Sequence, residues 1–428
     1  MSNPDSSYIE TSKKWFDKAL AYDNAKNYKK AIECYDKSTN LNPKYHSAWY
    51  NKGLAYDSLK NYKQAIECYD KATEIDPKDG HGWSLKGISC FNLENYEDTI
   101  SCYDKAIELD VEDEFTWYYK GESYFYLKNY EKAISCYDKA NVELETEDKE
   151  TFYLIRKGVS YSYLKNYKKA IECYDKATDI DPKDGNTWRS KGLAYENLKN
   201  YQKAIACYDK ATDIDPKDWS AWRSKGLAHH NLKNHKKAIA CYDKATRINP
   251  KNLQAWYSKG LAHGYLKNYQ KAIECYDKAT MIDPKDQDSW FRKGSAYYML
   301  ENYEEAIACY EKFTDINVKN DFVWYAMGMS YSNSGNYGSV EEAIACYDNS
   351  TKINPKNGNA WFRKALAYET LVKRKEAIAC YDKVIEINPK HEDTWHNKSK
   401  VHYELGNYKE AIACCDKLIE INPKYANA

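Results

Sequence analysis

The sequence predicts an all-α protein made of antiparallel helix pairs that repeat along the chain. Three observations support this fold class. The composition is biased, with 43 Tyr, 12 Trp and 14 Cys among 428 residues, and such bias is typical of a short pattern copied many times. Tryptophans recur mostly at a spacing of 34 residues, and Gly, Tyr, Ala and Pro recur at fixed distances from them. The periodic tryptophans are Trp15, Trp49, Trp83, Trp117, Trp188, Trp222, Trp256, Trp290, Trp324, Trp361 and Trp395.

The register of the repeat follows from these tryptophans, each of which we number as position 0 of its repeat. Leu154 fills the tryptophan position that is missing between Trp117 and Trp188, and Trp219 lies outside the series. The chain therefore contains twelve repeats of 34 residues with two three-residue insertions, near 141–150 and near 338–340. We expect an N-terminal segment over 1–11, a single solenoid over 12–425 and a tail over 426–428.

Each repeat is predicted to form two helices. Trp, Gly and Tyr at 0, +4 and +7 lie on one face of a first helix, and Ala, Tyr and Ala at +16, +20 and +23 lie on one face of a second. Asn at +12, such as Asn61, stands where the first helix must stop, because Asn tolerates the left-handed conformation that closes a helix. Pro at +28, such as Pro77, ends the second helix. The small Gly and Ala let the helices approach closely, with Trp and Tyr between them.

This pattern resembles the tetratricopeptide repeat, whose signature is W-x2-L-G-x2-Y, then A-x3-F, then P, at a period of 34. The resemblance covers nearly the whole chain and departs from the signature in two regular ways. Lys replaces Leu at +3 in eleven repeats, with Met327 as the exception, and Tyr replaces Phe at +20 in all repeats but the last, which has Cys415. The resemblance implies an α-solenoid with a right-handed superhelix, whose first helices line a concave groove and whose second helices form the convex back.

Composition argues against several classes of function. The 64 basic residues balance the 64 acidic ones, so the chain lacks the basic excess that favours nucleic-acid binding. The first residues contain no signal-like segment, and no apolar run approaches the roughly 18 residues of a membrane span. We therefore expect a soluble, intracellular and cytoplasmic protein that binds neither nucleic acid nor membrane.

Cysteine and histidine clusters suggest metal or redox chemistry, but packing explains them more simply. Twelve cysteines occupy +19, one per repeat, and helices about 8–10 Å apart would keep such a column too far apart for disulfides. Three of four clustered histidines, His229, His235 and His263, replace the tyrosines of the repeat, and no paired C-x2-4-C completes a zinc signature. We expect no metal and no cofactor, and the cysteines to be buried free thiols.

The lysine column at +3 could form an anion-binding stripe. Its eleven near-identical copies instead indicate a role in the fold, with the stem of each lysine buried and its head in water. No P-loop, nucleophile-elbow or HExxH motif occurs. We therefore expect no catalytic residues and no enzymatic activity.

By the resemblance, positions −2, +1, +5, +8 and +9 of the first helices line the groove. Aromatic stretches in repeats four, five and eight to ten then flank a segment with two arginines, and exposed aromatics and Arg are typical of binding hot spots. Padding between neighbouring repeats is the alternative for these aromatics. The candidate partner-binding residues are Phe115, Tyr118, Phe125, Tyr126, Phe152, Tyr163, Arg189, Arg223, His230, Tyr257, Tyr265, Phe291, Tyr298, Phe322 and Tyr325.

One known partner class can be tested against the sequence. Family members that hold the C-terminal carboxylate of heat-shock chaperones carry Asn at +5 of the first repeat of their clamp. None of the twelve repeats here has Asn at +5, so that clamp is absent in its recognisable form.

Two functions remain open. The first is a non-enzymatic interaction scaffold or adaptor whose groove binds a peptide segment of another protein, with Arg189 and Arg223 favouring an acidic segment that carries bulky apolar residues. The second is a regulatory or assembly subunit of an enzyme complex, which recognises a folded partner through its convex face or ends. The twelfth repeat has no following repeat to cover Ile412 and Ile419, so we also expect weak self-association there.

Overall fold

The computed structural model describes residues 4–140, 147–335 and 339–423, and these form 24 α-helices without a β-strand. The all-α fold predicted from the sequence is therefore confirmed. The chain divides into two compact units, Met1–Pro216 and Lys217–Ala428, and each is described by itself. The first predicted insertion, near 141–150, lies largely outside the described residues, and the predicted tail over 426–428 lies wholly outside them. The second predicted insertion, near 338–340, lies partly outside them. One continuous solenoid over 12–425 stays a prediction.

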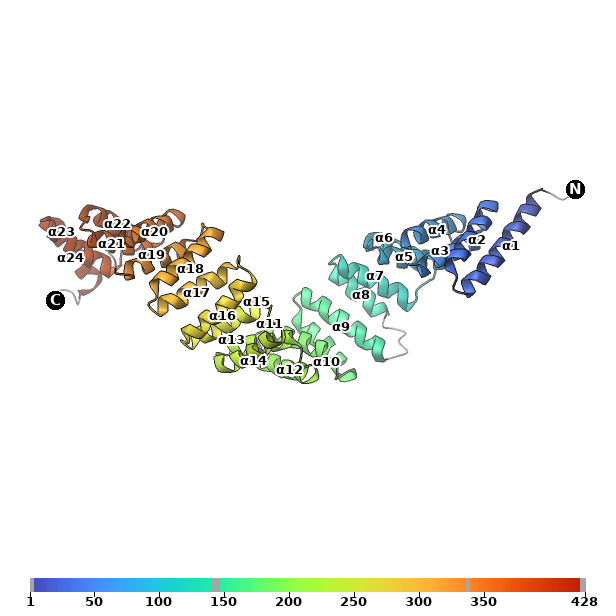
Figure 1. Ribbon diagram of the computed structural model, residues 1–428, viewed down its shortest axis with the longest axis horizontal. Helices are drawn as coiled ribbons and strands as arrows, with labels where there is room; N and C mark the ends of the chain where they lie inside the picture. Colours follow the sequence, from blue (N-terminus) through green and yellow to red (C-terminus); the bar gives the residue numbers. More distant parts are fainter. Residues whose placement is uncertain (1–3, 141–146, 336–338, 424–428) are drawn as a thin grey trace. The chain divides into compact units, whose positions relative to one another are not determined.

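Helices follow the predicted register closely (Figure 1). Unit 1 contains α1 (Pro4–Asn24), α2 (Tyr28–Leu41), α3 (His46–Ser58), α4 (Tyr62–Ile75), α5 (Gly80–Asn92), α6 (Tyr96–Glu108), α7 (Glu114–Tyr126), α8 (Tyr130–Ala140), α9 (Glu147–Tyr163), α10 (Tyr167–Ile180), α11 (Gly185–Asn197) and α12 (Tyr201–Ile214). Unit 2 contains α13 (Trp219–Asn231), α14 (His235–Ile248), α15 (Leu253–Tyr265), α16 (Tyr269–Ile282), α17 (Gln287–Met299), α18 (Tyr303–Ile316), α19 (Asp321–Asn333), α20 (Ser339–Ile353), α21 (Gly358–Thr370), α22 (Arg374–Ile387), α23 (Glu392–Glu404) and α24 (Tyr408–Ile421).

Helices pack as pairs that stack in chain order within each unit. Within each unit, every odd-numbered first helix packs against the second helix that follows it, and that second helix packs against the next first helix of the same unit. Successive first helices also contact one another, as α5 does with α7 and α15 with α17, more extensively than successive second helices do. The first helices therefore lie on the inner side of the curvature within each unit, which is the side a solenoid uses for binding.

The close approach of the two helices of a repeat depends on the glycine at +4. A Cβ atom added at Gly53 would lie 2.5 Å from the ring of Tyr69 at +20, and one at Gly192 would lie 2.5 Å from the ring of Tyr208. Both tyrosine rings are fully buried. The tyrosine therefore fills the space that the missing side chain leaves, as the sequence predicts.

The turn between the two helices corrects one sequence prediction. Asn61, expected in the left-handed conformation, has φ −96° and caps the start of α4, whereas the preceding residue Lys60 has φ 58°. The same left-handed position, +11, is occupied by Lys267 at φ 59° and by Gly406 at φ 77°. Asn at +12 stands at the N-cap of the second helix, and in repeats one and five its side chain accepts the backbone N–H three residues on, although that of Asn61 does not. The left-handed residue before it is usually a lysine that carries steric strain.

The lysine column at +3 joins neighbouring repeats. Lys52 Nζ lies 2.6 Å from a carboxylate oxygen of Asp36 in the preceding repeat and 4.7 Å from the ring centre of Trp49. Lys293 repeats the arrangement with Asp277 at 2.7 Å. The carboxylate at +21 is thus bridged to the next repeat, which supports a role of this column in the fold. The expectation that the lysine heads lie in water is wrong, because the side chain of Lys52 is only 12% exposed.

Candidate partner-binding surface

All fifteen candidate binding residues lie on first helices, between α7 and α19. Phe115, Tyr126, Phe152, Tyr163, Tyr265 and Phe322 are exposed. Half-buried are Tyr118, Phe125, Arg189, Arg223, His230, Tyr257, Phe291, Tyr298 and Tyr325. The sequence pattern therefore places these side chains on the helices that form the inner side of each unit.

Aromatic residues of α7 and α9 meet in unit 1. The ring centres of Tyr118 and Phe152 lie 5.7 Å apart, and those of Phe125 and Tyr163 lie 5.9 Å apart, both in edge-to-face contact. Such pairs stabilise a packed arrangement beyond the area they bury. The structure thus brings these four candidates together across the junction of repeats four and five.

The aromatic residue at +9 has a second role that the sequence analysis missed. Tyr163 stacks on Tyr130, the first residue of the preceding second helix, at 4.7 Å between ring centres and 5° between planes. Tyr265 stacks in the same way on His235 at 4.9 Å and 8°. One face of the +9 ring therefore supports the preceding repeat, yet Tyr265 is still 65% exposed. An aromatic ring at +13 of one repeat followed by an aromatic ring at +9 of the next could have predicted this contact from the sequence.

A buried carboxylate lies beneath the aromatic cluster of unit 1. Glu122 at +5 is only 2% exposed, although the register predicts that it lines the groove. Its carboxylate accepts hydrogen bonds from the Tyr137 hydroxyl at 2.6 Å and from the Arg156 guanidinium at 2.5 Å. Burial raises the pKa of Glu122, and the hydrogen bond from Tyr137 and the charge of Arg156 oppose the rise. The site is closed, because the Glu122 carboxylate already accepts hydrogen bonds from both the Tyr137 hydroxyl and the Arg156 guanidinium.

Carboxylates reach the buried tyrosine hydroxyl from a second position, +8. The Tyr69 hydroxyl donates to Asp57 at 2.7 Å, and the Tyr208 hydroxyl donates to Glu196 at 2.7 Å. Burial raises the pKa of Asp57, against the hydrogen bonds from Tyr69 and Ser89. A carboxylate on the first helix is therefore one recurring partner of the tyrosine at +20, and a serine hydroxyl takes this role in repeats five, nine and ten.

Arg189 and Arg223, the two arginines singled out by the sequence, belong to different units. Arg189 is half-buried on α11, where its guanidinium donates to the side-chain oxygen of Asn186 at 2.9 Å. Arg223 is half-buried on α13 in unit 2. Each is therefore considered with its own unit.

Unit 1 contains a cavity of about 310 Å³ between α9, α10 and α11. Its walls come from positions +5, +8 and +9 of the first helices, and its floor includes Tyr174 at +20. We name it the Leu193 cavity, after the residue that α11 contributes at +5. Its lining residues are Val159, Ser162, Tyr163, Tyr167, Tyr174, Ser190, Leu193, Ala194 and Asn197.

Unit 2 contains two neighbouring cavities. The first, which we name the Gly264 cavity, has a volume of about 250 Å³ and is lined by Leu261, Gly264, Tyr265, Tyr269, Ala272, Tyr276, Arg292, Ser295, Ala296 and Met299. The second, the Met329 cavity, has a volume of about 240 Å³ and is lined by Ser295, Tyr298, Met299, Tyr310, Tyr325, Ala326 and Met329. The two cavities share Ser295 and Met299 and so lie side by side along the first helices.

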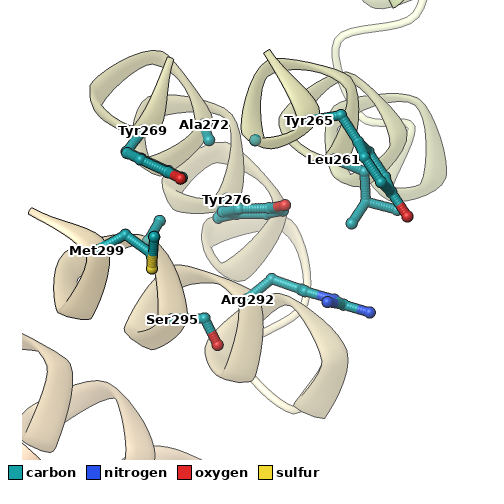
Figure 2. A pocket seen from close by; sticks show the side chains of 10 residues that line it. Leu261, Tyr265, Tyr269, Ala272, Tyr276, Arg292, Ser295 and Met299 are labelled. Carbon is teal, nitrogen blue, oxygen red and sulfur yellow. The ribbon is translucent and has the colours of Figure 1, made fainter. Parts of the chain in front are cut away.

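The Gly264 cavity places two polar groups among apolar walls. Figure 2 shows the ring of Tyr276 between Arg292 and Ser295 of α17 and the α15 residues Leu261 and Tyr265. Burial raises the pKa of Tyr276, and the nearby Arg292 opposes this rise. The Arg292 guanidinium is hydrogen-bonded to Tyr257. Within the residues that the structure describes, Arg292 forms no ion pair with a carboxylate. The sequence analysis missed Arg292, because +2 is not a groove position of the family.

The predicted absence of metal chemistry remains a prediction. His230 and His235 lie 4.9 Å apart between ring centres, and burial and the neighbouring His235 lower the pKa of His230. Among the described residues, no group of three or more His, Cys, Asp or Glu side chains lies close enough together to hold a metal ion. Cysteines in the described part of the chain are free thiols, and all but Cys415 are buried. Cys90, which replaces the tyrosine at +7, is hydrogen-bonded to Cys102.

None of the described helices combines the length and apolar character that a membrane crossing requires. No curated protein sequence matches the chain. Among solved structures, YrrB, a TPR protein with an unusual peptide-binding site, is 22% identical, with 45% of this chain and 97% of that chain covered and a TM-score of 0.41. Yeast Tom70 is 14% identical, with 98% of both chains covered and a TM-score of 0.38. A chain of the APC/C hetero-tetramer Cut9–Hcn1 is 13% identical, with 95% of this chain and 92% of that chain covered and a TM-score of 0.36.

Family models described as tetratricopeptide repeat match most of the chain. One model matches residues 46–79, 152–184, 185–218, 219–252, 253–286, 288–317 and 358–391. A second matches 12–45, 115–141 and 392–425, and a third matches 323–357. These matches keep the 34-residue register that the tryptophans define. The chain therefore belongs to the tetratricopeptide repeat family, whose repeats support a general role as a protein–protein interaction scaffold.

Proposed function

We propose that the chain is a non-enzymatic scaffold that binds an acidic, apolar-rich peptide segment of a partner protein on the first-helix side of its repeats. The observation that carries this proposal is the position of the cavities. Three cavities lie between successive first helices, with walls at +5, +8 and +9 and a buried tyrosine in each lining. Within unit 2, the two neighbouring cavities suit a segment that inserts one side chain into each.

The size of the cavities favours side chains over whole small molecules. Their volumes, about 240–310 Å³, lie at or below the lower end of the roughly 300–1,000 Å³ that is typical of small-molecule sites. Their tyrosine and methionine walls suit apolar anchors, which are typical of binding hot spots. Each cavity therefore fits one bulky residue of an extended or helical segment.

The charge of the surface favours an acidic partner. Arg189 is half-buried on α11, the helix that contributes Leu193 to the Leu193 cavity of unit 1, and Arg223 is half-buried on α13 in unit 2. Half-buried arginines form stronger pairs with carboxylates than exposed ones do. An acidic residue in the bound segment would therefore add affinity in either unit.

The experiment reverses the charge of each arginine and measures partner binding. Arg189→Glu and Arg223→Glu, singly and together, should weaken binding of a partner captured by the wild-type chain, whereas Lys210→Glu on the second helix α12 should not. Far-UV circular dichroism checks that each variant stays helical. Unchanged binding by the double variant would show that this side of the repeats is not the binding surface.

A second candidate function is recognition of a folded partner or a second copy through the last repeat. Helix α24 exposes apolar side chains, with Tyr408 59% and Ile412 62% exposed, and Ile419 is exposed beside them. Clusters of exposed apolar residues are typical of interaction surfaces. Light scattering over a wide concentration range should show weak self-association that Ile412→Lys removes. A strictly monomeric wild-type chain at high concentration would reject self-association at this helix.

A further inference from the structure

The closed site of repeats four and five shows how this fold binds a carboxylate. Three register positions take part: the acid at +5, the tyrosine at +20 and an arginine at +2 of the next repeat. The carboxylate of Glu122 binds the Tyr137 hydroxyl and the Arg156 guanidinium while 98% of the glutamate is buried. The chain thus contains its own precedent for a carboxylate held between these two groups.

Repeats eight and nine keep two of the three positions and lack the acid. Tyr276 occupies +20 and Arg292 occupies +2 of the next repeat, but +5 is Leu261. In the described part of the chain, no hydrogen-bond partner reaches the Tyr276 hydroxyl and no carboxylate pairs with Arg292. Both groups line the Gly264 cavity, so the place of the missing acid is open.

The second route to the tyrosine hydroxyl is also missing in this repeat. Position +8, which carries the hydrogen-bonding acid Asp57 in repeat two and Glu196 in repeat six, is Gly264 in repeat eight. A Cβ atom added at Gly264 would have nothing within 4 Å. The first helix of repeat eight therefore contributes a side-chain carboxylate from neither position, and Gly264 leaves the space at +8 unfilled.

We propose that the Gly264 cavity binds a carboxylate side chain of the partner, which takes the place that Glu122 fills within repeat four. The Tyr276 hydroxyl donates a hydrogen bond to this carboxylate, and Arg292 supplies the opposite charge. Hydrogen bonds to a charged group in a site walled by Leu261, Tyr265 and Met299 are stronger than those in open water. This inference rests on the proposed peptide-binding function and names the site and chemistry of one contact.

The neighbouring Met329 cavity defines the residue beside that acid. It shares Ser295 and Met299 with the Gly264 cavity, and its other walls are Tyr298, Tyr310, Tyr325, Ala326 and Met329. This lining contains no charged side chain. The partner segment should therefore carry an apolar residue close to its Asp or Glu.

Peptides displayed as a random twelve-residue library provide the probe. Binders are selected on the full-length wild-type chain and counter-selected against Gly264→Glu, whose added carboxylate reaches Tyr276 as Glu196 reaches Tyr208. The selected peptides should contain Asp or Glu next to an apolar residue. Each is then compared with its Glu→Gln or Asp→Asn version, and the neutral peptide should bind at least about tenfold more weakly.

Protein variants locate the contact. Arg292→Gln should weaken the acidic peptides at least about tenfold and abolish their advantage over the neutral versions. Arg363→Gln, an arginine at the same register position that does not line this cavity, is the matched control and should leave both unchanged. Gly264→Ala adds only a methyl group, keeps the cavity open and should bind the peptides like the wild type. It therefore shows whether Gly264→Glu blocks binding through its carboxylate rather than through the loss of the glycine.

The outcomes separate this inference from the proposed function. Peptides that bind the wild type but show no preference for acid, or keep it in Arg292→Gln, would overturn the carboxylate site and leave peptide binding intact. The carboxylate site would also be overturned if every peptide that binds the wild type bound the Gly264→Glu variant equally well. No binders at all would overturn both the site and the proposed function.

Discussion

Repeats four and eight share one backbone and differ in what their buried tyrosine contacts. In repeat four the Tyr137 hydroxyl is bound by Glu122, and Arg156 of the next repeat completes the site. In repeat eight Tyr276 faces a cavity of about 250 Å³ that Arg292 also lines. The positions that repeat therefore set the fold of each unit, whereas an open site arises in repeat eight, which lacks the carboxylate that repeats one, two, four, six and eleven supply to the tyrosine at +20.

The largest effect is expected in the closed site. Glu122→Ala leaves the Arg156 guanidinium and the buried Tyr137 hydroxyl without their acceptor, and breaking a buried ion pair in this way costs about 3 kcal/mol. Chemical denaturation of the full chain should show this loss, and hydrogen exchange should place it in α7 to α9. A loss below about 1 kcal/mol would show that the three groups do not act as one buried site.

A second prediction compares the same substitution in the two repeats. A Cβ atom at Gly121 would lie 2.8 Å from the Tyr137 ring, and one at Gly260 would lie 2.6 Å from the Tyr276 ring. Glu122 holds the Tyr137 ring, whereas the Tyr276 ring can shift into its cavity. Because overpacking costs about 1–3 kcal/mol where nothing can move, Gly121→Ala should be less stable than Gly260→Ala by about 1 kcal/mol in denaturant unfolding. The opposite order would mean that the cavity gives Tyr276 no freedom.

Filling the open site should stabilise it. Gly264→Glu replaces a helical glycine, which is worth about 0.5–1 kcal/mol, and adds a carboxylate for the Tyr276 hydroxyl. Gly264→Ala supplies only the first of these effects and is the control. Thermal unfolding should rank the glutamate variant above the alanine variant and both above the wild type. Equal stability of the two variants would show that the added carboxylate does not reach Tyr276.

The smallest effect tests whether the two repeats differ outside their sites. Lys128 and Lys267 occupy the same turn position, at φ 61° and 59°. Because Gly adopts this conformation without steric strain, Lys128→Gly and Lys267→Gly should each stabilise by about 1 kcal/mol or less, and by the same amount. Calorimetry on the two single variants checks this equality, and a clear difference would show that the repeats differ in their turns as well.

The repeated positions were predictable from the sequence because each has one physical role. The spacing of Trp, Gly and Tyr gave the helix pairs, and the glycine–tyrosine contact confirms why Gly53 and its counterparts are small. The turn was less predictable, since Asn61 suits both a left-handed residue and a helix cap. Only the dihedral angles of Lys60 and Asn61 distinguish the two roles.

The candidate site was predictable only in part. The groove positions located Tyr265 and Tyr298, which line the cavities. They missed Arg292, because its register position lies outside those positions and its neighbour Tyr276 comes from the preceding repeat. Gly264 was missed for another reason: a site made by an absent side chain leaves no motif. The signal was the acid at +8 in repeats two and six, whose partner Tyr hydroxyl only the structure reveals.

The central claim is that a partner carboxylate completes the site of Tyr276 and Arg292. A double-mutant cycle tests it most directly, by combining Arg292→Gln in the chain with Glu→Gln in a selected peptide and measuring the four dissociation constants by calorimetry. We expect a coupling energy of about 1.5–3 kcal/mol, as for a hydrogen bond to a charged group. Additive effects, with a coupling energy below about 0.3 kcal/mol, would contradict it.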